Sequence, residues 1–234
     1  MVAENVRNIR ARIEAACHRA GRSVDSVTLI AVTKTFGPEL VKEAIAAGVH
    51  DIGENYVQEA LEKRERVLAP DVRWHYIGHL QSNKVKYIIE WVHMIHTVDS
   101  LTLAAEIQKR AVKIGRIAEV LVEVNTSDEA SKFGVKPEHT LELLASLAAL
   151  PNIRLNGLMT IGPFEPDPEA SRPVFKLLKS IFDEANALAV MREPMCHLSM
   201  GMTHDFEVAI DEGATMVRIG TAIFGTRKKP GVPL

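Results

Sequence analysis

The chain has 234 residues, of which 47% are hydrophobic, so it can bury the core of one barrel-sized domain or of two smaller ones. A formal net charge of −2 and scattered basic residues argue against the basic surface of a nucleic-acid-binding protein. Two cysteines, Cys17 and Cys196, are too few for a disulfide framework, and no apolar stretch reaches transmembrane length. We therefore expect a cytoplasmic protein with no nucleic-acid or membrane partner.

The predicted elements alternate between helix and strand along the whole chain. Residues 2–20 form an amphipathic helix with Val6, Ile9 and Ile13 on one face, and Gly21 ends it. The apolar, β-branched run at residues 27–32 is typical of a strand that is covered on both faces. Further strands are expected at residues 50–53, 74–78, 94–98, 118–124, 153–159, 195–198 and 215–219. Further helices are expected at residues 38–47, 55–67, 82–89, 100–114, 137–150, 168–189 and 203–212.

This order predicts the fold class. Eight strands and eight helices, the first helix preceding the first strand, predict a single (β/α)₈ barrel of the TIM type with an extra N-terminal helix. We expect residues 1–234 to form one domain. A doubly wound open sheet is the alternative, but no G-x-G-x-x-G motif follows the first strand to support it.

Polar residues collect after the predicted strands, where barrels of this type build their active sites. Lys34 follows the apolar first strand, so its stem should lie against the core and its amine at the barrel mouth. Partial desolvation favours the neutral form of an amine, and a neutral amine can condense with a carbonyl to form a Schiff base. The alternative is a lysine whose amine simply reaches solvent from a strand end.

Two short glycine motifs follow the last two strands. Ser199-Met200-Gly201 and Gly220-Thr221 stand where such barrels often bind a phosphate. Small residues let backbone N–H groups approach phosphate oxygens, and the hydroxyls add donors. A tight turn is the alternative for each motif. A strand-end lysine facing a phosphate site is the arrangement that a phosphorylated aldehyde requires.

Arginine and histidine side chains give two further hypotheses. Arg218, two residues before Gly220, is either a donor to the ring nitrogen of a cofactor or one half of a structural ion pair. His75 and His79 are four residues apart, but the segment is predicted to be a strand, so the helical metal-binding geometry does not apply. We therefore expect no metal site.

Seven sequence segments, spread over the whole chain, resemble the pyridoxal phosphate homeostasis proteins. Three lie in the first half: A-V-T-K at residues 31–34, G-E-N-Y-V-Q-E at 53–59 and W-H-Y-I-G-H-L-Q-x-N-K at 74–84. Four lie in the second half: V-N-x-x-x-E-x-x-K-x-G at 124–134, G-L-M-T-I at 157–161, L-S-M-G-M-T-x-D-F-x-x-A-I at 198–210 and R-I-G-T-x-I-F-G at 218–225. Together these segments are highly specific.

The resemblance implies a barrel of the alanine-racemase N-terminal type that holds pyridoxal 5′-phosphate as a Schiff base on Lys34. The other cofactor-binding residues that it implies are Ser199, Gly220 and Thr221 at the phosphate, Arg218 near the ring nitrogen, and Asn55 and Met159 beside the cofactor. It implies no catalytic residue.

The implied function is a non-catalytic protein of intracellular vitamin B6 homeostasis, which buffers the cofactor or carries it to pyridoxal-phosphate-dependent apoenzymes, as a monomer or weak dimer. A low-activity amino-acid racemase is the second hypothesis. Related racemases carry a further β-rich domain that supplies a tyrosine base, whereas Tyr56, Tyr76 and Tyr87 all lie in the first half of this chain. A Schiff-base aldolase, with a phosphorylated substrate in the phosphate site, is the third.

Overall fold

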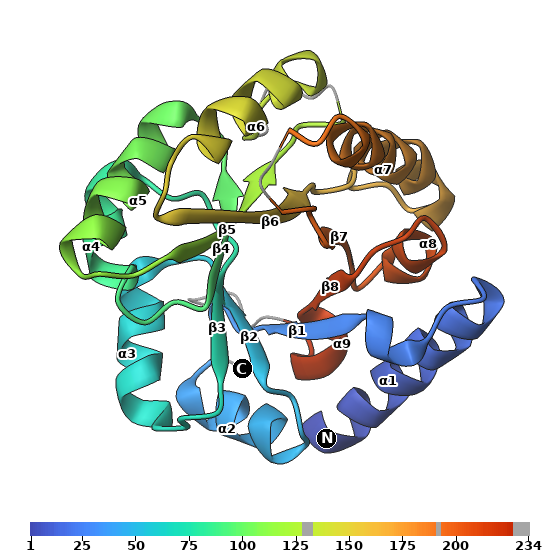
Figure 1. Ribbon diagram of the computed structural model, residues 1–234. Helices are drawn as coiled ribbons and strands as arrows, with labels where there is room; N and C mark the ends of the chain where they lie inside the picture. Colours follow the sequence, from blue (N-terminus) through green and yellow to red (C-terminus); the bar gives the residue numbers. More distant parts are fainter. Residues whose placement is uncertain (128–132, 191–192, 227–234) are drawn as a thin grey trace.

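The structure, a computed structural model, describes residues 1–127, 133–190 and 193–226. Eight parallel strands close into a barrel in chain order, and helices surround them (Figure 1). The strands are β1 (Thr28–Val32), β2 (Asp51–Glu54), β3 (Arg73–Tyr76), β4 (Met94–Val98), β5 (Ala118–Glu123), β6 (Ile153–Met159), β7 (His197–Met202) and β8 (Met216–Ile219). The predicted (β/α)₈ barrel is therefore confirmed.

The N-terminal helix α1 (Val2–Arg19) lies outside the barrel and packs against α2, α8 and α9, so that it completes the outer ring (Figure 1). Val6, Ile9 and Ile13 lie on its buried face, as their spacing predicted. The other helices are α2 (Pro38–Ala46), α3 (Val57–Val67), α4 (Val85–Ile88), α5 (Leu101–Lys113), α6 (Thr140–Ala148), α7 (Arg172–Ala187), α8 (Phe206–Asp211) and α9 (Thr221–Phe224).

Several elements differ from the sequence-based expectation, and three of these differences matter for the site or the outer ring. The helix expected at residues 82–89 is a 3₁₀ turn, Ser82–Lys84, followed by the single turn of α4. The seventh strand was expected to end at residue 198, but β7 continues to Met202 and buries Ser199 and Met200. Helix α9 was not predicted, because four residues are too few to show helical periodicity.

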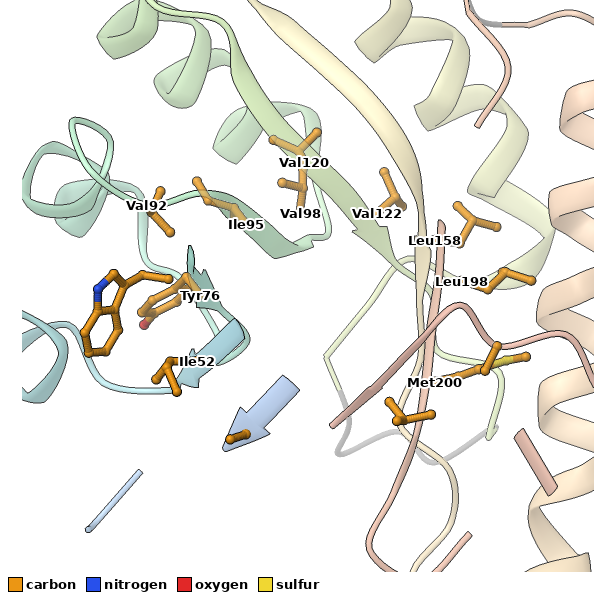
Figure 2. Close-up of a cluster of buried hydrophobic side chains, with 14 of the residues drawn as sticks. Ile52, Tyr76, Val92, Ile95, Val98, Val120, Val122, Leu158, Leu198 and Met200 are labelled. Atoms are coloured by element: carbon orange, nitrogen blue, oxygen red, sulfur yellow. The ribbon is translucent and has the colours of Figure 1, made fainter. Parts of the chain in front are cut away.

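Two hydrophobic clusters lie on the two sides of the strands, because successive side chains of a strand point to opposite faces. The larger cluster fills the space between the barrel and the helices, and Figure 2 shows part of it, including Ile52, Ile95 and Leu158. The smaller cluster consists of Ile30, Met94, Leu121, Met159 and Met216. Its members Ile30 and Met216 lie two residues before Val32 on β1 and Arg218 on β8, so their side chains point to the same inner face of the barrel. This cluster is therefore the floor of the barrel mouth.

A buried ion pair fixes the end of β1, where the segment carrying Lys34 begins. The Nζ atom of Lys63 on α3 donates to the Glu54 carboxylate at 2.6 Å and to the Thr33 carbonyl at 2.6 Å. The Thr33 hydroxyl donates to the same carboxylate. Burial raises the pKa of Glu54, although Lys63 acts in the opposite direction. The pair ties β1, β2 and α3 together and thereby sets the direction in which the chain leaves β1.

Glu123 ends β5 inside the barrel and is only 5% exposed. Burial raises the pKa of its carboxyl to about 7, against the opposing attraction of Arg218, and the nearby Asp99 raises it further. The protein therefore holds a titratable carboxyl group in an interior position, where its neutral form is favoured at mildly acidic pH.

Replacing Glu123 with Gln should remove a pH dependence of stability. Because the folded pKa is raised above its ordinary value, the folded protein keeps a proton that the unfolded chain has released, and this stabilisation disappears as the pH rises through about 7. We expect the free energy of unfolding, measured by urea titration, to fall as the pH rises from about 5 to about 8. This decrease should be larger in the wild type than in Glu123→Gln, by on the order of 2 kcal/mol. The exposed change Glu43→Gln is the control, and equal slopes in wild type and Glu123→Gln would contradict this expectation.

Candidate functional site

A cavity of about 480 Å³ opens at the carboxyl ends of the strands. Lys34 and Asn55 line it from the segments after β1 and β2, and Arg218, Gly220 and Thr221 line it from β8 and its end. These strand ends are neighbours because β1 is hydrogen-bonded to both β2 and β8. Closure of the barrel thus brings together five of the seven predicted cofactor-binding residues.

Lys34 and Asn55 are both half-buried at one side of this cavity. The Asn55 side-chain oxygen Oδ1 is buried and has no hydrogen-bond partner within the described chain. The Asn55 backbone is held close to Gly78, where a Cβ atom would stand 2.3 Å from the Asn55 carbonyl oxygen. The Tyr76 hydroxyl donates to the same carbonyl at 3.0 Å, and burial raises the pKa of Tyr76 to about 12. A buried acceptor without a donor, at the wall of a cavity, is a place for a ligand O–H or N–H group.

Arg218 is buried, at 4% exposure, and lines the same cavity from β8, the strand next to β1. Its NH1 donates to the carbonyl and to the hydroxyl of Ser199, both at 2.7 Å, and its NH2 donates to the Thr160 carbonyl at 2.7 Å. Burial lowers the pKa of the guanidinium to about 10, so it remains a cation at neutral pH. Among the described residues its hydrogen bonds go to carbonyl and hydroxyl oxygens and not to a carboxylate, which argues against the structural ion-pair hypothesis. Three of its five N–H groups are used in this way, which leaves two for a ligand.

The other two predicted site residues, Met159 and Ser199, are fully buried and do not line the cavity. Met159 belongs to the apolar floor, and Ser199 lies beneath Arg218 as its acceptor. The two are neighbours across β6 and β7. The structure therefore places them under the candidate site and not at its surface.

Sequence reasoning missed Thr203, which lines the cavity and accepts a hydrogen bond from the Thr221 hydroxyl at 3.2 Å. It had been assigned to a helix, whereas α8 starts only at Phe206. The register of β7 against β8 shifts between Ser199 and Met202, and Gly201 has a positive φ of 88° there. Such a bulge re-aims the strand, and it brings Thr203 to Thr221. The signal in the sequence was a hydroxyl residue two positions after Gly201.

Two further observations concern the described part of the chain. Among residues 1–127, 133–190 and 193–226, no three His, Cys, Asp or Glu side chains are grouped so that they could hold a metal ion. None of the helices there is long and apolar enough to cross a bilayer. The central part of the segment at residues 124–134, namely 128–132, lies outside the described residues.

The chain is similar to known proteins over almost its whole length. The family profile described as "Alanine racemase, N-terminal domain" matches residues 4–228. A pyridoxal phosphate homeostasis protein of Aquifex aeolicus is 48% identical over 225 residues, which cover 96% of this chain and 98% of that protein. Another, of Pseudomonas aeruginosa, is 42% identical and covers 97% of this chain and 96% of that protein.

A solved structure is similar as well. PipY of Synechococcus elongatus, with pyridoxal phosphate bound, superposes with a TM-score of 0.84 at 32% identity and covers 96% of this chain and 100% of that chain. The identities and the coverage are far above what a shared fold alone would give. The chain therefore belongs to the pyridoxal phosphate homeostasis protein family, as its sequence motifs predicted.

Proposed function

We propose that this protein binds pyridoxal 5′-phosphate as a Schiff base on Lys34 and acts in vitamin B6 homeostasis as a buffer or carrier. The observation that carries the proposal is the cavity at the barrel mouth, which is lined by Lys34, Arg218 and Gly220 together. Its volume of about 480 Å³ is within the range of small-molecule sites. Family membership supports the same cofactor, since PipY binds it.

The polar groups of the cavity match those of the cofactor. The Lys34 amine suits the aldehyde, and the orphaned Asn55 Oδ1 suits the phenolic hydroxyl as donor. The hydroxyls of Thr203 and Thr221 suit the phosphate, because they can donate to its oxygens. Gly220 lies beside them and offers its backbone without a side chain in the way. Bound there, the cofactor supplies a reactive aldehyde and an aromatic ring that can accept electrons.

The role of Arg218 favours holding the cofactor over transforming a substrate. A guanidinium offers only donors, so a ring nitrogen that accepts from it stays unprotonated and withdraws electrons weakly. We therefore propose a non-catalytic protein whose partners are pyridoxal phosphate and the cytoplasmic apoenzymes that receive it. In this proposal residues 1–234 form one cofactor-binding domain.

Lys34→Ala should abolish covalent attachment of the cofactor. After incubation with pyridoxal phosphate and borohydride reduction, mass spectrometry of peptides should find the reduced adduct on Lys34 of the wild type and none in the variant. Lys84→Ala is the matched control, because Lys84 lines the neighbouring cavity that shares Asn55. A wild type that forms no adduct, even with excess pyridoxal phosphate, would falsify the proposal and leave the aldolase hypothesis in its place.

Gly220→Ala should weaken binding of the phosphorylated cofactor alone. An added Cβ would stand 3.4 Å from the Val32 carbonyl oxygen, an ordinary contact, so the fold should tolerate it. The methyl group would cover the backbone that is proposed to approach the phosphate. We expect the affinity for pyridoxal phosphate to fall at least about tenfold, and that for pyridoxal less than about twofold, in equilibrium titrations. An equal loss of affinity for pyridoxal phosphate and for pyridoxal would show that the phosphate does not bind at Gly220.

The racemase hypothesis keeps one supporting observation. Tyr56 is 54% exposed and lines the cavity next to the candidate site, so the structure does offer a phenol near the barrel mouth. A racemase would need such a group to move a proton at the α-carbon of an amino acid. This hypothesis differs from the carrier in one measurable property, the exchange of that proton with solvent.

For the carrier we expect no exchange of the α-proton of L-alanine in deuterated buffer above that caused by the same concentration of free pyridoxal phosphate. Proton NMR measures the exchange directly. Exchange that disappears in Lys34→Ala and falls at least about tenfold in Tyr56→Phe would instead establish the racemase. Tyr87→Phe, at an exposed position on α4, is the control.

A further inference from the structure

A chain of hydrogen-bonded side chains crosses the barrel interior beneath Arg218. The Nδ1 atom of His96 lies 3.0 Å from the Oγ of Ser199, the hydroxyl that accepts from Arg218. The Nε2 atom of His96 lies 2.9 Å from the Nδ1 of His75, and the Nε2 of His75 lies 2.9 Å from Oδ1 of Asp51. We call Asp51, His75, His96 and Ser199 the histidine network; it runs through β2, β3, β4 and β7, and every member is buried.

The end of the histidine network far from Arg218 is an anion. Arg73 donates to both oxygens of the Asp51 carboxylate, at 2.7 and 2.6 Å. Burial alone would raise the pKa of Asp51, but the donors Arg73 and His75 together lower it well below its ordinary value. The histidine network therefore joins an ionised carboxylate to the guanidinium of Arg218 at the barrel mouth.

The distances and the donor chemistry give one self-consistent order of hydrogen bonds when both imidazoles are neutral. The Asp51 carboxylate can only accept, so His75 donates from Nε2 and must accept at Nδ1. His96 then donates from Nε2 and accepts at Nδ1, and the Ser199 hydroxyl donates to it. The remaining lone pairs of Ser199 Oγ are thereby turned toward the donor NH1 of Arg218. Burial holds the pKa of His96 well below its ordinary value, which keeps this imidazole neutral.

This order has a consequence for the guanidinium. A serine hydroxyl can rotate, and without a partner that takes its proton it would not present a fixed acceptor. The bond from Ser199 to His96 fixes the hydroxyl, and the fixed hydroxyl adds a third acceptor to the carbonyls of Ser199 and Thr160 that already hold Arg218. Three acceptors on two nitrogens define the plane of the guanidinium, and hence the direction of its two remaining N–H groups.

We propose that the histidine network is a positioning device, which holds the Arg218 guanidinium so that it donates to the ring nitrogen of the bound cofactor. This inference rests on the proposed binding of pyridoxal phosphate. It adds Asp51, His75 and His96 to the site and gives Ser199 a different role; in this inference all four act on the cofactor only through Arg218 and do not touch it.

The test compares two ligands that differ at one atom: pyridoxal phosphate and its carbocyclic analogue with C–H in place of the ring nitrogen. Both carry the aldehyde and the phosphate, so both can bind to Lys34. Ser199→Ala removes the acceptor with almost no change in volume, and we expect it to weaken pyridoxal phosphate about tenfold but the analogue less than about twofold. Apparent dissociation constants come from the fraction of borohydride-trapped adduct over a ligand series. His197→Gln, at another interior-facing position of β7, is the control.

A pair of His96 variants separates hydrogen bonding from packing and covers the case in which Ser199→Ala does not fold. An asparagine amide lies near the Nδ1 position of an imidazole, so His96→Asn can still accept from Ser199. A glutamine amide lies near the Nε2 position, so His96→Gln keeps the partner His75 and loses Ser199. We expect His96→Gln to resemble Ser199→Ala, and His96→Asn to retain most of the wild-type preference for pyridoxal phosphate.

Several outcomes would overturn the inference. Equal weakening of both ligands would show a merely structural role, and unchanged binding of pyridoxal phosphate in Ser199→Ala would show no role. In the cofactor-free protein, ¹⁵N NMR should find His96 protonated at Nε2 and bare at Nδ1, and the opposite tautomer would reverse the donor order. If wild-type protein binds neither ligand, the proposed function fails. If the wild type binds both ligands and the variants weaken both equally, only the proposed role of the histidine network fails.

Discussion

The interior of this barrel is organised around one costly group, the buried guanidinium of Arg218. A buried cation is tolerated only where acceptors satisfy it. Here Thr160 and Ser199 supply three acceptor oxygens, and the carboxylates of Asp205 and Glu123 attract it from further away. Glu123 shares this interior, where burial raises the pKa of its carboxyl to about 7 against the opposing attraction of Arg218.

The register shift in β7 allows this strand to contribute both to the buried interior and to the open cavity above it. Three residue steps on β7, from Ser199 to Met202, oppose two on β8, from Met216 to Arg218. A regular strand would have turned either Ser199 or Met202 away from the barrel interior. The irregularity lets Ser199 reach Arg218 from below while Met202 and Thr203 line the cavity. Gly201, with its positive φ and the close approach of Phe206, is the residue that permits this path.

What could be predicted from the sequence depends on how local each feature is. The barrel and the place of Lys34 were predictable, because an apolar β-branched run and the residue after it are read from adjacent positions. The position of Ser199 beneath the site was not, because it depends on where β7 bulges and on the packing of α8. In the sequence His75 stands four residues from His79, and nothing there links it to His96; the contact between His75 and His96 follows from the pairing of β3 with β4, which periodicity does not specify. The cofactor contacts of all seven predicted site residues stay predictions.

The neutral hydroxyl of Ser199 suits an anion-binding site better than a carboxylate would. A carboxylate in its place would pair directly with Arg218, neutralise the cation and draw its N–H groups down into the barrel. The hydroxyl accepts one hydrogen bond and leaves the charge uncancelled. Asp51 stands at the other end of two imidazoles and is itself paired with Arg73, whereas Asp205 and Glu123 attract the guanidinium without a hydrogen bond to it. Arg218 therefore remains a cation at the wall of the cavity, which is where a phosphorylated, electron-rich ligand would lie under the proposed function.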